Sequence, residues 1–124
     1  MSKSPNISEA EWQVMETLWQ RSPLTAAAVS TALKKNRWAA NTVRTLLTRL
    51  VKKGALTYEQ DGNRYLYCAA VRREDCVQGE VESFTTRLFG GAAQPLLVHF
   101  VQNKKLSAAD ITELKKILDE KEGK

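Results

Sequence analysis

The side chains best suited to chemistry in this chain lie on one face of a single expected helix, residues 39–54. Read at 100° per residue, this stretch places its aliphatic side chains on one side. The opposite side carries only hydroxyl, amide and cationic groups: Asn41, Thr42, Arg44, Thr45, Thr48, Arg49 and Lys52. The stretch contains no aspartate or glutamate, whose charge a polyanion would repel. Because the groups present donate hydrogen bonds to phosphates and base edges, they predict a helix that binds nucleic acid.

The position of each side chain along this helix suggests its role. The N-terminal residues of a major-groove helix reach deepest, so base or phosphate contacts are expected from Asn41, Thr42, Arg44, Thr45 and Thr48. The later cations, Arg49, Lys52 and Lys53, are expected to bind the phosphate backbone. Arg44 or Arg49 can hold guanine O6 and N7 with both arms of its guanidinium. The alternative, a merely solvated cationic face, weakens once the neighbouring elements are considered.

Two further helices are expected ahead of this one. Ser8 and Glu11 form the capping-box pattern at the start of the first helix. Thr25 is expected to cap a second, alanine-rich helix, Thr25–Lys35. The third helix, which carries the polar face, should end at Gly54, because glycine accepts the left-handed conformation that often follows a helix.

After the third helix, the period of the apolar pattern changes from 3.6 residues to two. Residues 55–60 and 63–68 are expected to be strands that flank Asp61-Gly62, a dipeptide that favours a type I′ turn. Arg64, just past the turn, can place its guanidinium over a phosphate or in the minor groove. Three helices followed by a hairpin are the order of a winged helix. Residues 1–72 are therefore expected to form a winged-helix DNA-binding domain.

Residues 73–124 return to helical periodicity and are expected to form a dimerisation domain. Two apolar stripes carry the expected contacts: Val77, Val81, Phe84 and Leu88 on the first helix, and Leu114, Ile117 and Leu118 on the last. Gly90-Gly91 should end the first helix, and a short helix at 95–101 should follow. Helices this short cannot bury their stripes alone, so a second copy of the chain is the expected partner. The fold class is mainly α with a small β-hairpin.

Composition limits the classes of function. Residues 1–73 hold 12 lysines and arginines against 5 acidic residues, and residues 74–124 hold 7 against 9. A basic half suits a polyanionic partner. No segment predicts a membrane span or a signal peptide, so a cytoplasmic protein without membrane insertion is expected. No catalytic triad, paired carboxylates, phosphate loop or zinc motif is present, so neither an enzyme nor a cofactor or metal is expected.

Three long motifs resemble the penicillinase-repressor (BlaI/MecI/CopY) family: ISEAEWQVMETLW at 7–19, TVRTLLTRLVKKG at 42–54, and LLVHFVQNKKLSAADITELKKIL at 96–118. The resemblance implies a homodimeric winged-helix repressor that occludes promoters by binding pseudo-palindromic operators of double-stranded DNA and regulates antibiotic resistance. It assigns recognition to Thr42, Arg44, Thr45 and Arg49, with Arg64 on the wing. It also implies release by proteolysis in the C-terminal part, triggered by a membrane-bound sensor protease as a further partner.

The inducing signal stays open. Penicillinase-type members are cut at an Asn-Phe pair ahead of an acidic stretch, whereas the aligned pair here is His99-Phe100 with no acidic stretch after it. His99, the only histidine, is expected to be packed or at an interface. The CxC motifs of copper-sensing members are absent. One alternative is direct sensing of metal or oxidation through Cys68 and Cys76, against which stands their interpretation as inert thiols. Another is a winged helix that docks an acidic protein.

Overall fold

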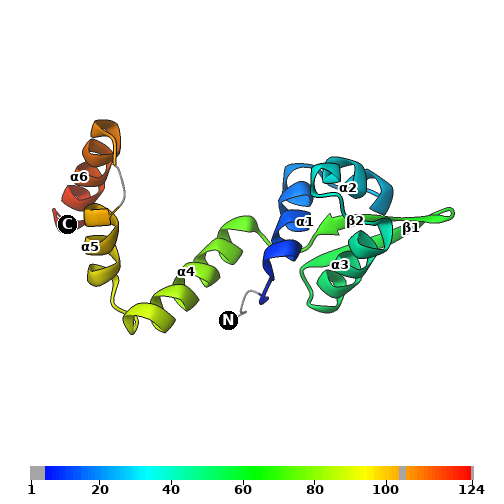
Figure 1. The fold of residues 1–124 in the computed structure, drawn as a ribbon, viewed down its shortest axis with the longest axis horizontal. Coiled ribbons are helices and arrows are strands. Elements are labelled where there is room, and N and C mark those ends of the chain that lie inside the picture. Colours follow the sequence, from blue (N-terminus) through cyan, green and yellow to red (C-terminus); the bar gives the residue numbers. More distant parts are fainter. Residues whose placement is uncertain (1–4, 104–105, 124) are drawn as a thin grey trace. The chain divides into compact units, whose positions relative to one another are not determined.

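The computed structural model describes residues 5–103 and 106–123, which fold mainly as helices with one antiparallel hairpin. This confirms the predicted fold class. The chain divides into two compact units, Met1–Val81 and Glu82–Lys124. In the first, three helices and the hairpin pack together (Figure 1): α1 Glu9–Gln20, α2 Ala26–Ala32, α3 Ala40–Lys52, β1 Leu56–Asp61 and β2 Arg64–Ala69. Among the described residues, no helix is long and apolar enough to cross a membrane.

The first helix begins as its sequence predicts. Ser8 Oγ accepts a hydrogen bond from the Glu11 backbone N–H at 3.2 Å, and Glu11 Oε1 accepts one from the Ser8 N–H at 2.9 Å. The two bonds complete the predicted capping box and satisfy N–H groups that have no partner within the helix. Val14, Met15 and Leu18 from the apolar stripe of α1 then form the centre of the core.

The second helix is shorter than predicted. Thr25 caps it, with Oγ1 accepting from the Ala28 N–H at 3.1 Å. The helix ends at Ala32 rather than Lys35, and the 3₁₀ turn η1 Lys34–Asn36 follows. Arg37 then adopts a left-handed φ of 58°. The 3₁₀ turn and the left-handed Arg37 change the direction of the chain before α3. The apolar period of α2 does not predict where this turn begins.

The third helix confirms both its predicted buried face and its predicted end. Val43, Leu46, Leu47 and Leu50 are buried against the other helices and β1. At the C-terminal end Gly54 has a φ of 84°. The Gly54 N–H donates to Val51 O at 3.0 Å and the Ala55 N–H to Leu50 O at 2.9 Å, the paired bonds of a Schellman motif.

The hairpin forms, but its turn is one residue later than predicted. Asp61 pairs with Arg64, so Gly62 and Asn63 are the two turn residues, and the expected strands 55–60 and 63–68 become 56–61 and 64–69. Gly62 has a φ of 65°, whereas Arg37 is the only described non-glycine residue with positive φ. Positive φ at the first turn position alone fits a type II′ turn. The predicted type I′ turn on Asp61-Gly62 is therefore wrong.

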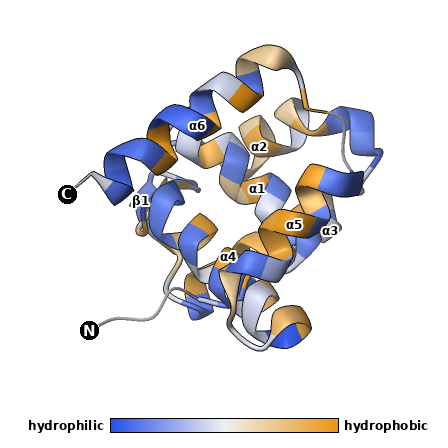
Figure 2. Cartoon of the chain, turned by 90° about the vertical axis from the view of Figure 1, so that its left-hand side faces the viewer, coloured by the Kyte–Doolittle hydropathy of each residue, from blue (hydrophilic) through white to orange (hydrophobic). Residues whose placement is uncertain are grey.

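The C-terminal unit is built of helices that expose apolar side chains. α4 Arg73–Phe89 ends at Gly90 and Gly91, which both have positive φ, as predicted. α5 Ala93–Asn103 is longer at both ends than the expected 95–101, and α6 Ala108–Glu122 begins at Ser107 with a capping box to Asp110. Figure 2 colours much of α5 hydrophobic, and hydrophobic segments recur along α6. The division between the two units falls inside α4, whereas the division into functional domains at residue 73 stays a prediction.

Candidate nucleic-acid interface

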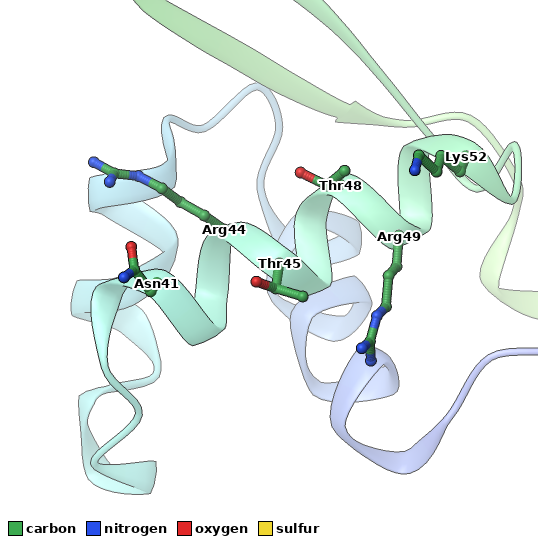
Figure 3. A pocket seen from close by; sticks show the side chains of 6 residues that line it. All are labelled: Asn41, Arg44, Thr45, Thr48, Arg49 and Lys52. Atoms are coloured by element: carbon green, nitrogen blue, oxygen red, sulfur yellow. The ribbon is translucent and has the colours of Figure 1, made fainter.

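Six of the predicted nucleic-acid contacts line one shallow hollow on the exposed face of α3. They are Asn41, Arg44, Thr45, Thr48, Arg49 and Lys52, and Figure 3 shows their side chains extending from the helix. From the first to the last of them the helix rises about 16 Å, comparable to the roughly 12 Å width of the major groove. Thr42 is exposed on α3 but does not line the hollow.

The buried face of α3 holds these side chains outward. Leu47 and Leu50 are fully buried, and the helix packs on α1, α2 and β1. Because four aliphatic residues fix the rotation of the helix, the polar positions between them must face solvent. No ion pair joins Arg44, Arg49 or Lys52 to another described residue. Their positive charges are therefore not neutralised by the carboxylates of the described chain and suit an anionic partner.

Lys53, at the C-terminal end of α3, does not line this hollow. Its ammonium donates to Glu11 Oε1 and to the backbone oxygen of Asn6 at 2.7 Å. Only 2 % of Glu11 is exposed. Burial disfavours the charged carboxylate, but hydrogen bonds from Lys53 and Ser8 outweigh it and hold the pKa of Glu11 below its ordinary value. The predicted phosphate contact at Lys53 is thus in competition with an ion pair inside the protein.

Arg64 stands at the tip of the wing, beside Asp61. Its Nη2 lies 3.1 Å and its Nε 3.3 Å from Asp61 Oδ2, and both side chains are well exposed. An exposed pair of this kind contributes little stability, so a phosphate can replace the carboxylate. Arg64 therefore lies on the hairpin where a wing contact is expected, and its ion pair with Asp61 is weak.

Three tyrosines on the wing extend the candidate surface toward α3. The ring of Tyr58 lies 4.9 Å from that of Tyr65 and 5.9 Å from that of Tyr67, and about half of Tyr58 and Tyr65 is exposed. Burial, with smaller effects of Tyr58 and Tyr65, raises the pKa of Tyr67, while the positive charge of Arg44 opposes this rise. Since α3 also packs on β1, the wing lies beside the helix that carries Arg44.

A second group of cations was not assigned to nucleic acid in the sequence analysis, which placed Lys34 and Lys35 at the end of the second helix. Lys34, Lys35 and Arg37 are exposed in and after the turn η1, directly ahead of the recognition face. Asn36 Nδ2 donates to Gln13 Oε1 at 2.8 Å and ties this turn to α1. The signal available in the sequence was the run KKNR, three cations without a carboxylate.

The two cysteines occupy different environments. Cys76 is 2 % exposed in the core, and burial, then the charges of Asp75 and Glu80, raise the pKa of its thiol. Cys68 is half-buried on β2, and both are free thiols. Within residues 5–103 and 106–123, no three His, Cys, Asp or Glu side chains are grouped to hold a metal ion. A raised thiol pKa lowers the reactivity of Cys76 at neutral pH.

His99 and Phe100 lie on α5 and both are exposed in the chain, so His99 is not packed within it, whereas the alternative of an interface position stays a prediction. Asn103 Nδ2 donates to the His99 backbone oxygen at 3.0 Å and lies 3.4 Å from its Nδ1. The seven apolar residues predicted to make dimer contacts lie on two helices of the chain: Val77, Val81, Phe84 and Leu88 on α4, and Leu114, Ile117 and Leu118 on α6. All are exposed except the half-buried Val77.

Comparison with known proteins relates most of the chain to one family. Residues 7–120 match the family model described as penicillinase repressor. The penicillinase repressor of Bacillus licheniformis is 35% identical over 121 residues, 97% of this chain and 94% of the relative. The methicillin resistance regulatory protein MecI of Staphylococcus aureus (strain N315) is 31% identical over 121 residues, 97% of this chain and 98% of the relative.

Solved structures match between 60% and 92% of the chain. The DNA-binding domain of the repressor BlaI is 37% identical, with a TM-score of 0.54 over 60% of this chain and 93% of that domain. The monomeric form of Bacillus licheniformis BlaI, in complex with the blaP half-operator, is 37% identical with a TM-score of 0.52 over the same shares. Escherichia coli MarR, at 20% identity and a TM-score of 0.51, shares the fold.

Proposed function

Since this chain belongs to the penicillinase repressor family, we propose that it is a transcriptional repressor that binds operator DNA through α3 and the wing. The observation that carries the proposal is the face of α3, where Arg44, Arg49 and Lys52 have no carboxylate partner among the described residues. A BlaI domain at 37% identity has been solved on a half-operator, which supports the same partner for this chain.

The proposed contacts follow the geometry of the surface. Asn41, Thr42, Arg44, Thr45 and Thr48 would meet base edges and nearby phosphates from the N-terminal part of α3. Arg49 and Lys52 would hold the backbone farther along, and Arg64 would reach it from the wing. The basic turn at residues 34–37 adds phosphate contacts beside the start of α3. Lys53 contributes only if DNA displaces Glu11.

We further propose that the protein acts as a homodimer. The exposed apolar stripes of α4 and α6 support a second copy as their partner, because soluble proteins rarely leave such stripes uncovered. Two copies would occupy the two halves of a pseudo-palindromic operator and block the promoter. The proposal implies a cytoplasmic protein, since bacterial DNA lies there.

Release of the operator is proposed to follow loss of the dimer. A cut between His99 and Phe100 would separate α6 from α4 and remove one of the two stripes. Both residues are exposed, but they lie within α5, so that helix must unfold locally before a protease can bind the chain. A membrane sensor protease is the proposed agent. Mass spectrometry of the protein from induced cells would detect fragments ending at residue 99, and an intact chain would rule out this route.

The proposed function is tested by footprinting the full-length protein on the DNA upstream of its own gene. We expect protection of two half-sites related by a dyad. Affinity should fall about a thousandfold or more between 50 and 200 mM salt if six or more phosphates are contacted. A shuffled duplex of the same length is the control. Equal binding of both duplexes, or of neither, would contradict the proposal, and the latter would favour a winged helix that docks an acidic protein.

A further inference from the structure

The start of α4 is attached to α1 by an ion pair that joins residues far apart in the sequence. Arg73 Nη2 lies 3.0 Å from Glu16 Oε2, and Arg73 Nε donates to both Glu16 oxygens at 3.1 and 3.2 Å. Glu16 Oε2 also accepts from Trp12 Nε1 at 3.0 Å, which fixes the carboxylate from the α1 side. The pair thus has two-armed geometry, and its acceptor is held in place.

Two further contacts hold the same segment. Trp19 Nε1 donates to the Val71 backbone oxygen at 2.9 Å, two residues before α4 begins. One turn into α4, Cys76 is buried in the core with the apolar residues of α1. Contacts before, at and after Arg73 therefore hold the start of α4 against α1 and the core. All of these residues belong to the first unit, Met1–Val81, here called the winged-helix unit.

The segment leads directly into the stripe proposed to form the dimer. α4 runs without a break from Arg73 to Phe89, and the boundary of the winged-helix unit falls inside it after Val81. These contacts oppose a swing of the helix about residues 70–72.

We propose that Glu16 and Arg73 are positioning residues that fix the direction in which α4 leaves the winged-helix unit, and that this direction makes the dimer selective for the spacing of operator half-sites. The inference rests on the proposed function. One inserted base pair rotates a half-site by about 35° and moves it by about 3.4 Å. If α4 holds the two winged-helix units of a dimer in fixed directions, they cannot both bind half-sites at the altered spacing. If the units can rotate freely, the dimer binds both spacings almost equally.

The test compares Arg73→Gln with Arg72→Gln in the full-length protein. Arg72 is the adjacent cation, and its partners Glu74 and Asp75 lie within three residues of it, so its loss removes the same charge without touching α1. Each protein is titrated with a half-operator duplex, the full operator, and the full operator carrying one extra base pair between the halves. Glu16→Gln, which retains an acceptor for Trp12, is the reciprocal variant.

We expect all four proteins to bind the half-operator equally. Arg73→Gln and Glu16→Gln should discriminate between the two spacings roughly two- to thirtyfold less than wild type, since each variant dimer loses two exposed ion pairs. Arg72→Gln should discriminate as wild type does. Wild-type discrimination in Arg73→Gln, or a loss of its half-operator binding, would overturn the inference. Failure of the wild-type protein to bind even the half-operator would instead contradict the proposed function.

Discussion

Arg44 and Lys53 both carry a positive charge, but the residues around the two charges differ. Both are cations on α3 or at its end, and the sequence analysis gave both to DNA. Lys53 lies against the buried carboxylate of Glu11, whereas Arg44 faces solvent and the wing, without an ion-pair partner among the described residues. We therefore expect that removing a positive charge weakens DNA binding only where that charge does not already form an ion pair inside the protein.

Arg44→Ala should therefore weaken operator binding by about 1–3 kcal/mol and relax the preference for one base, because a guanine edge loses the guanidinium that donates to its O6 and N7. Titration of operators substituted at single positions measures both effects. Arg87→Ala is the matched control, since Arg87 is an exposed cation in the last turn of α4. If Arg44→Ala retained wild-type affinity and base preference, Arg44 would leave the list of recognition residues.

Glu11 gives a prediction about stability and pH. Its folded-state pKa lies below its ordinary value of 4.5, so its contribution is fully present above that pH and is lost as the pH falls toward the folded-state pKa. Glu11→Gln should lower the free energy of unfolding at pH 7, on the order of 1–3 kcal/mol. The difference from wild type should shrink below pH 4.5. Urea unfolding at pH 7 and 3.5 measures this, with Glu9→Gln, an exposed neighbour, as control. A difference that grows in acid would contradict the mechanism.

At the scale of the element, signals confined to a few neighbouring residues predicted the structure well. Ser8 with Glu11 set the start of α1 and Gly54 set the end of α3, because each motif satisfies backbone groups within one turn. The hairpin turn was displaced by one residue because Asp-Gly and Gly-Asn are both turn-forming dipeptides. Cross-strand pairing, including Asp61 with Arg64, selects between them.

The missing cap of α3 is an element-scale weakness that a substitution can correct. Ala39 occupies the N-cap with extended backbone, φ −67° and ψ 156°, and offers no side-chain acceptor. Ala39→Ser should place an oxygen near the N–H of Thr42 and stabilise the fold by about 1 kcal/mol. Thermal unfolding measures the gain. Ala40→Ser, one residue later and inside the helix, should bring none. An unchanged midpoint for Ala39→Ser would show that water already satisfies this helix end.

The basic turn before α3 is predicted to contact phosphate rather than bases. Replacing both Lys34 and Lys35 by Ala should weaken binding to all sequences equally and reduce the slope of log affinity against log salt by roughly 2, since each lost contact contributes about 0.9. Lys115→Ala with Lys116→Ala, on α6, is the matched control. An unchanged slope would show that these two lysines make no phosphate contact.

At the scale of the whole molecule, the candidate site was predicted more fully than its surroundings. Six exposed side chains on one face of α3 followed from a single helical period, which a buried aliphatic face enforces. The partners of Lys53 and Arg73 could not be predicted, because they lie 42 and 57 residues away in the sequence. Contacts at such separation depend on how the helices pack, which no local pattern contains.

The proposed dimer depends on the apolar stripe of α6. Leu114 is exposed on the apolar stripe of α6, and Leu114→Glu should place a charge in the proposed interface and give a monomer at micromolar concentration. The full operator should then bind on the order of a hundredfold more weakly, because the second half-site no longer binds as part of one particle. Thr112→Glu adds the same charge beside the stripe and should stay dimeric. Sedimentation and titration on half and full operators separate the effects. A Leu114→Glu dimer with full operator affinity would move the interface away from α6, whereas a wild-type monomer would remove the dimer from the proposed mechanism.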